Sequence, residues 1–181
     1  MNSSLEIVFG SFLAYAPKGE TPNSKRIKGV CLRVKDDGFL IIKDKGRFPA
    51  IPTFVELLHS ELAQTPFKEL LNGGPILVPM PRSAPSKPGS LMPARRICEE
   101  MLKFRLGSEM RLLLTRIKAV PKAAFAASSQ ERPTIQQHID SMRVESDLLS
   151  ATTSTPIVVV DDVVTRGTSF IAAIMMVGGR T

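Results

Sequence analysis

The stretch TPIVVVDDVVTRGTSFIAAIMMV, Thr155 to Val177, places two adjacent carboxylates directly after a run of β-branched residues. The run Ile157–Val160 predicts a buried strand, because short continuous apolar segments rich in Val and Ile favour the interior of a sheet. A short loop with one glycine follows, and an apolar segment long enough for a helix comes next. The stretch therefore predicts a strand–loop–helix unit with both acids at the carboxyl end of its strand.

The chain before this stretch alternates in the same way. Short apolar runs predict strands at Pro75–Val78 and Leu112–Thr115, and helical periodicity predicts helices at Pro93–Leu106 and Pro133–Met142. Such alternation is typical of an α/β fold, a parallel sheet with helices on both faces. Ligands bind such sheets outside the carboxyl ends of the strands, where the acid pair lies.

The amino-terminal part follows a different pattern. Val30–Val34 and Phe39–Ile42 flank the sequence KDDG, which predicts a β-hairpin, and the polar segment Lys18–Lys28 predicts a loop. Thr53–Gln64 predicts a helix that opens with a capping box formed by Thr53 and Glu56.

Composition is that of an ordinary globular protein. The 181 residues are 43% hydrophobic and 23% charged, which suits one domain with a sizeable core. No apolar run has the length of a membrane span, and the first residues lack the features of a secretory signal. Cys31 and Cys98 have no metal-type spacing. We therefore expect a cytoplasmic protein with reduced thiols and no membrane partner.

Positive charge is concentrated in the middle of the chain. Residues 82–143 hold 12 Lys and Arg against 5 Asp and Glu, so they account for +7, equal to the net charge of the whole chain. This field favours an anionic partner, and a solvated basic face explains it equally well. Nucleic acid stays open as a partner without being indicated, because there is one Tyr, no Trp and no nucleic-acid-binding motif.

The acids and the loop after them suit a sugar phosphate. Asp161 and Asp162 would repel each other unless hydroxyl groups or a cation such as Mg²⁺ satisfied them. Gly167 permits close backbone approach, and hydroxyl side chains and N–H groups gather there at a helix start, which favours phosphate. A ribose 5-phosphate offers a diol and a phosphate at this spacing.

Other readings of the acid pair fit less well. A Walker B strand would need an upstream G-x-x-x-x-G-K-[ST] loop, which the sequence lacks. A receiver domain would carry its acids near the start of the chain. A simple helix cap accounts for Thr168 or Ser169 and leaves the acid pair unexplained. His138 is expected at the surface, and no nucleophile–histidine pair supports hydrolase chemistry.

The segment VVVDDVVTRGTS resembles the phosphoribosyl pyrophosphate (PRPP) signature of type I phosphoribosyltransferases. A wider resemblance, through ILVPMPRS, LTRIKAVPKAAFA and ERPTIQQH, is to the ComF-like branch. It covers residues 76–181, which we expect to form a PRPP-binding α/β core. Residues 1–75 carry no recognisable family motif and are expected to form a hood-like extension packed on that core.

The resemblance implies a role for each matching residue. Asp161 and Asp162 would hold the ribose hydroxyls, directly or through Mg²⁺, and so serve catalysis. The residues implied around the 5-phosphate are Thr165, Arg166, Gly167, Thr168 and Ser169. Those implied around pyrophosphate are Met80, Pro81, Arg82 and Ser83, in a loop that often carries a cis peptide in the family. The flexible-loop cations that would reach pyrophosphate are Lys118, Lys122 and Arg132.

The expected function is that of a phosphoribosyltransferase in nucleotide metabolism. It would bind PRPP and Mg²⁺, pass the phosphoribosyl group to an unidentified N-nucleophile and release pyrophosphate. The alternative is a regulator that senses PRPP without turnover, or a competence- or defence-associated protein of the same fold. Relatives continue beyond the signature helix, whereas this sequence stops at GGRT, so binding with slow turnover is expected. A homodimer is left open.

Overall fold

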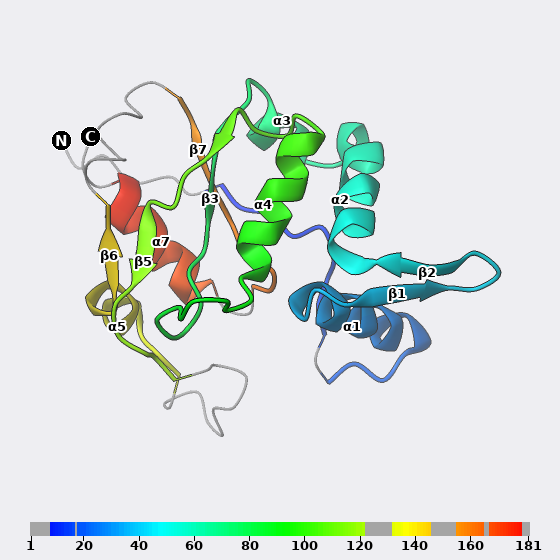
Figure 1. Cartoon of the computed structure of the whole chain (residues 1–181), viewed down its shortest axis with the longest axis horizontal. Coiled ribbons are helices and arrows are strands. Elements are labelled where there is room, and N and C mark those ends of the chain that lie inside the picture. Colours follow the sequence, from blue (N-terminus) through cyan, green and yellow to red (C-terminus); the bar gives the residue numbers. More distant parts are fainter. Residues whose placement is uncertain (1–7, 17, 122–131, 146–154, 165–166, 179–181) are drawn as a thin grey trace.

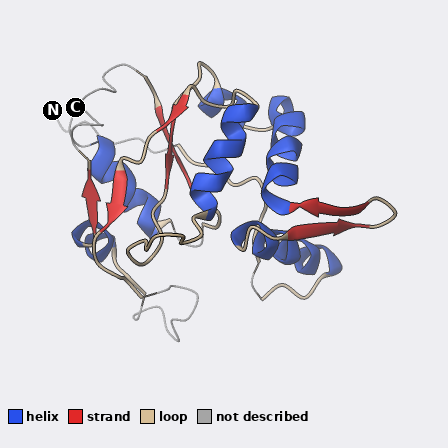
Figure 2. Cartoon of the chain, viewed as in Figure 1, coloured by secondary structure: helices blue, strands red, loops and turns tan. Residues whose placement is uncertain are grey.

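The computed structural model describes residues 8–16, 18–121, 132–145, 155–164 and 167–178. Its helices are α1 (Pro22–Lys35), α2 (Ala50–Glu61), the 3₁₀ helix η1 (Leu62–Gln64), α3 (Phe67–Leu71), α4 (Pro93–Lys103), α5 (Ile135–Asp140) and α7 (Thr168–Gly178). Its strands are β1 (Phe39–Ile42), β2 (Gly46–Pro49), β3 (Ile76–Pro79), β4 (Glu109–Met110), β5 (Leu114–Arg116), β6 (Met142–Val144) and β7 (Ile157–Val160). Figures 1 and 2 show their arrangement. None of the described helices is both long and apolar enough to cross a membrane.

A parallel sheet with the strand order β4-β3-β7 forms the centre of the molecule. Strand β3 is buried throughout and pairs in register with β7, from Ile76 opposite Ile157 to Pro79 opposite Val160. Strand β3 is fully buried, whereas β7 is half-buried along its length rather than buried as predicted; both are continuous apolar runs, as is usual in parallel sheets. The predicted α/β class and the strand Ile157–Val160 are therefore confirmed.

Helices cover the sheet on two sides. Leu77 of β3 and Val158 of β7 pack with Ile97 and Met101 of α4 in one apolar cluster. Their sequence neighbours Ile76, Val78, Ile157 and Val159 pack with Ala172 and Ala173 of α7 in the other. Successive side chains of a strand point to opposite faces, so α4 and α7 lie on opposite faces of the sheet.

The middle strands differ from the sequence prediction. The strand beside β3 is the two-residue β4, which no periodicity predicts because a strand this short completes no pattern. The predicted strand Leu112–Thr115 is present as β5, but it pairs antiparallel with β6 outside the parallel sheet. The predicted helix Pro133–Met142 is shorter, as α5, because its last residue, Met142, opens strand β6.

The predicted hairpin at Val30–Val34 is wrong, and the loop predicted for Lys18–Lys28 is mostly helix. Thr21 caps α1 by accepting a hydrogen bond from the Ser24 N–H, and Pro22 occupies the first turn. The sequence DDG ends the helix instead of turning a hairpin. The N–H groups of Asp37 and Gly38 donate to the carbonyl oxygens of Val34 and Arg33, the two bonds of a Schellman motif. Asp37 has the required positive φ, 46°.

The hairpin that does form joins β1 to β2 and extends beyond α1 and α2 (Figure 1). On its outer face Ile41 is 86% exposed, and the Arg47 guanidinium lies 3.8 Å from the centre of the Phe39 ring. Leu40, on the other face, packs against the core. Thr53 does not cap the next helix, because α2 already begins at Ala50, directly after β2.

Candidate functional site

The acid pair lies at the carboxyl end of β7. The Asp162 N–H donates to a carboxylate oxygen of Asp161 at 2.9 Å, so the two residues form one local unit. One residue before them, the Val160 carbonyl accepts from the Met80 N–H at 2.8 Å. The pairing of β3 with β7 thus continues to the ends of both strands, and the loops that follow them start side by side.

The surroundings of Asp161 disfavour its negative charge. Burial raises its pKa well above the ordinary value, and the neighbouring charge of Asp162 raises it further. The positive charge of Lys35 acts in the opposite direction without balancing these effects. A hydroxyl donor or a cation at this position would relieve the cost of ionising Asp161.

Helix α1 contributes to the surroundings of the acid pair. Burial raises the pKa of the Cys31 thiol, and the Asp162 charge adds to this rise. Cys31 and Lys35 are four residues apart, which places them on one side of the helix. The sequence does not single out Lys35, because it opens the segment KDDG, which predicts a hairpin turn. The helix-start signal Thr21-Pro22 would have identified this helix.

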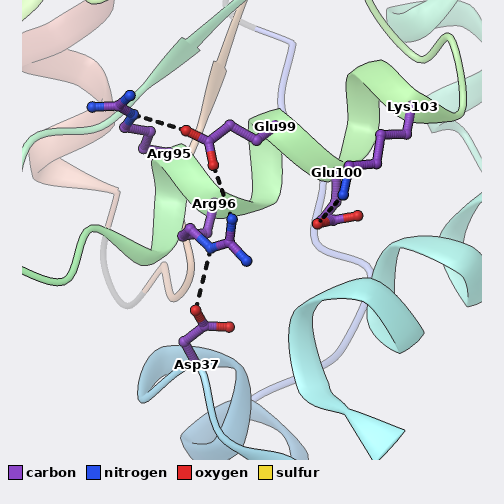
Figure 3. Close-up of polar contacts among 6 residues, drawn as sticks. All are labelled: Asp37, Arg95, Arg96, Glu99, Glu100 and Lys103. Atoms are coloured by element: carbon purple, nitrogen blue, oxygen red, sulfur yellow. Dashed lines mark hydrogen bonds and ion pairs between the residues drawn. The ribbon is translucent and has the colours of Figure 1, made fainter.

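An ion pair fastens the end of α1 to the α/β core. The Arg96 Nε lies 3.2 Å from a carboxylate oxygen of Asp37, and its Nη1 lies 3.1 Å from Glu99 (Figure 3). On the same helix, Arg95 pairs with Glu99 and Lys103 with the buried Glu100. Asp37 therefore ends α1 and also links it to α4, so it holds the last turn of α1 in place relative to the sheet.

The loop after the acids leads into α7 through Gly167. Its φ is +72°, a conformation that glycine adopts without strain, and a Cβ atom there would meet nothing within 4 Å. Its carbonyl accepts from the Ile171 N–H, so Gly167 stands at the N-cap. Within the described part of the chain, the N–H groups of Thr168, Ser169 and Phe170 have no hydrogen-bond partner. An anion is the natural partner for such groups.

The four residues predicted to bind pyrophosphate lie in the loop after β3, and their surroundings differ. Met80 and Pro81 are buried, and Met80 belongs to the core cluster with α7. The Arg82 guanidinium donates to the Leu91 carbonyl at 3.1 Å, so it closes its own loop. Ser83 is half-buried. The described residues contain no cis peptide, so the cis bond that the resemblance implies is absent from this loop.

Two carbonyl groups of this loop, those of Arg82 and Ser83, accept hydrogen bonds from the end of β5 and the chain that follows it. The Arg82 carbonyl accepts from Arg116 Nε at 2.9 Å, and the Ser83 carbonyl accepts from the Val120 N–H at 2.8 Å. In a trans peptide the N–H points opposite to the C=O. The N–H groups of Ser83 and Ala84 therefore point away from residues 116–120, and neither has a partner among the described residues. Two such neighbouring N–H groups suit an anion.

Arg116 is a second residue that the sequence does not single out. It ends β5 and is 4% exposed, and burial lowers its pKa to about 10 although the Asp161 charge opposes this. A cation at the end of a short apolar strand could have marked it as a buried charge, but not its contact with the loop after β3.

His138 contradicts the expectation of a surface position. It is buried on α5, and its Nδ1 has no hydrogen-bond partner among the described residues. Burial lowers its pKa, and the nearby Arg116 charge lowers it further, so the imidazole is held neutral.

The predicted flexible-loop cations are only partly described. Lys118 is exposed after β5, and Arg132 is half-buried with an unpartnered Nε in the described part of the chain. Lys122 lies outside the described residues, as do Thr165 and Arg166 of the predicted phosphate loop.

The acid pair suits Mg²⁺ that is shared with a ligand. The described residues contain no group of three or more His, Cys, Asp and Glu side chains that could form a cage. Mg²⁺ commonly takes one or two carboxylates and completes its shell with water and substrate oxygens. Asp161 and Asp162 supply such a pair, and the raised pKa of Asp161 marks a place where positive charge is favourable.

Comparisons of the chain with protein-family models, with curated proteins and with solved structures find no match.

Proposed function

We propose that the chain binds PRPP with Mg²⁺ and transfers its phosphoribosyl group to an N-nucleophile, releasing pyrophosphate. The observation that carries this proposal is the register of β3 and β7. Pro79 pairs with Val160, and the Met80 N–H binds the Val160 carbonyl. The acid pair and the loop whose Ser83 and Ala84 N–H groups have no partner among the described residues therefore start at neighbouring points of one sheet edge.

Each part of PRPP has a complementary group at this edge. The carboxylates of Asp161 and Asp162 accept hydrogen bonds from the ribose hydroxyls or hold Mg²⁺, which supplies charge neutralisation when bound. The free N–H groups at the start of α7 receive the 5-phosphate. Those of Ser83 and Ala84 receive the pyrophosphate, whose departure from C1 they favour by stabilising its charge.

The reaction needs little acid–base catalysis from side chains. The N-nucleophile forms a bond to C1 as the bond from C1 to the pyrophosphate oxygen breaks, and pyrophosphate leaves with the electron pair. Holding the two reactants in line accounts for most of the catalysis. The charge of Lys35, on helix α1, acts on Asp161 at this edge.

A PRPP-sensing regulator without turnover is the second candidate. It is favoured by the position of Arg82, whose guanidinium binds the Leu91 carbonyl. A leaving pyrophosphate would then meet backbone N–H groups rather than this cation. The two candidates predict the same binding and differ in pyrophosphate release.

Calorimetric titration with PRPP, with and without Mg²⁺, tests the binding. The matched control is the double variant Asp161→Asn, Asp162→Asn, which keeps side-chain size and removes both charges. We expect Mg²⁺-dependent binding that the double variant loses. Equal PRPP affinity in both proteins would refute the proposal. A pyrophosphate-release assay with ammonia, amines and nucleobases as acceptors then separates the enzyme from the regulator.

A further inference from the structure

Arg116 connects three parts of the candidate site. It extends from the end of β5, its Nε donates to the Arg82 carbonyl at 2.9 Å, and its Nη1 donates to the Ser141 hydroxyl. Ser141 follows α5 and in turn donates to the His138 carbonyl at 2.9 Å. The guanidinium is thus held on one side by the end of α5, and on the other side it holds the loop after β3.

The contact with Arg82 sets the direction of a peptide group. The planar guanidinium presents its N–H donors in a fixed fork, so a carbonyl bound to it has little freedom to turn. Holding the Arg82 carbonyl directs the Ser83 N–H to the opposite side. The Val120 N–H holds the next carbonyl in the same way and so directs the Ala84 N–H.

Burying a charged side chain for this purpose is costly. Arg116 is 4% exposed, and within the described part of the chain no carboxylate forms an ion pair with it. Asp161 is the acid whose charge reaches it. A buried cation without a directly paired acid is unusual in a merely structural position, where an apolar residue would pack at lower cost.

We propose that Arg116 is a positioning residue that orients the backbone N–H groups of Ser83 and Ala84 toward the pyrophosphate of PRPP. This inference rests on the proposed function. Loss of the guanidinium frees the Arg82–Ser83 peptide to rotate and so weakens the part of the site that binds pyrophosphate. Among the described residues, the Arg82 carbonyl accepts from Arg116 and from none of the acid pair or the start of α7, which form the part that binds ribose 5-phosphate.

The test compares affinities for ribose 5-phosphate, pyrophosphate and PRPP by calorimetry with Mg²⁺ present. Arg116→Lys keeps the charge near Asp161 and removes the fork, and Ser141→Ala removes the other contact of the guanidinium and leaves the contact with Arg82. We expect Arg116→Lys to weaken pyrophosphate and PRPP about 10- to 100-fold, the range of one charge-assisted hydrogen bond. Ribose 5-phosphate affinity should stay unchanged, and Ser141→Ala should preserve the ratio of the two affinities.

A second variant perturbs the loop without touching a buried residue. Val120→Pro removes the N–H that binds the Ser83 carbonyl, in a half-buried loop position. It should weaken pyrophosphate in the same selective way, and it keeps the test informative if Arg116→Lys does not fold.

The outcomes separate the inference from the proposed function. If the wild-type chain binds neither ribose 5-phosphate nor PRPP, both the inference and the proposed function are refuted. If the wild type binds both ligands and the variants weaken them equally, or weaken neither, Arg116 has no positioning role and the proposed function stands. Selective loss of pyrophosphate affinity in Arg116→Lys and Val120→Pro supports the inference.

Discussion

Substitution of Gly167 separates phosphate binding from stability. Its φ of +72° is unfavourable for other residues, and a Cβ atom would meet nothing within 4 Å, so Gly167→Val introduces backbone strain without a clash. Such strain costs about 1–2 kcal/mol. For a chain of this size that lowers the melting temperature by about 2–8 °C. The side chain would stand beside the free N–H groups at the start of α7, so ribose 5-phosphate binding should be lost.

Gly73 provides the matched control. Its φ is +80°, and a Cβ atom there would also meet nothing within 4 Å. It lies between α3 and β3, at the amino end of the strand, opposite the end that carries the site. Gly73→Val should lower the melting temperature by a similar amount and leave ribose 5-phosphate affinity unchanged, as measured by thermal melting and calorimetric titration. Equal ribose 5-phosphate affinity in the two variants would show that the phosphate does not bind at Gly167.

Three further predictions concern stability. The raised pKa of Asp161 contributes stability that is complete below about pH 3.8 and is lost as the pH rises through the folded-state pKa. Asp161→Asn should therefore raise the melting temperature at neutral pH and not at pH 3. An equal gain at both pH values would contradict this. The lowered pKa of His138 contributes stability that is present above pH 6.5 and is lost as the pH falls toward the folded-state value, so His138→Gln should flatten the urea midpoint between pH 7 and pH 5. Leu77→Ala should cost about 2–5 kcal/mol in urea unfolding, since Leu77 is fully buried, while Leu57→Ala at an exposed position should cost about 0.5 kcal/mol or less.

Most of the fold that could be predicted from the sequence was predicted from long apolar runs and from the residues that end the strands. Ile157–Val160 is a strand in both the sequence prediction and the structure, because a short continuous run of β-branched residues indicates a strand of a parallel sheet, although these residues are only half-buried. The sequence DDG misled for a physical reason: a helix C-cap and a hairpin turn both require a residue with positive φ. Only the Thr21-Pro22 start distinguishes the two, and it lies 15 residues or so before the cap.

The candidate site was predictable where a residue follows a strand. The acid pair and Gly167 stand at the expected end of β7 and start of α7. The contribution of Arg116 was not predictable, because it depends on an antiparallel pair, β5 with β6, that brings a buried cation to the loop after β3. The proximity of Lys35 to Asp161 was not predictable either, because it depends on how α1 packs against the core through Asp37 and Arg96.

The pairing of β3 with β7 also shapes how the chain folds during synthesis. The two strands bind residue for residue, yet about 80 residues separate them in the chain. At about 5–20 residues per second a ribosome needs roughly 4–16 s to add the second strand after the first. During that interval the apolar residues of β3 have no partner on the side that β7 later occupies. When translation is slow or the cell is under heat stress, this segment is therefore exposed to aggregation for longer than any other strand of the described chain. Chaperone dependence should increase with the length of the pause before residue 157.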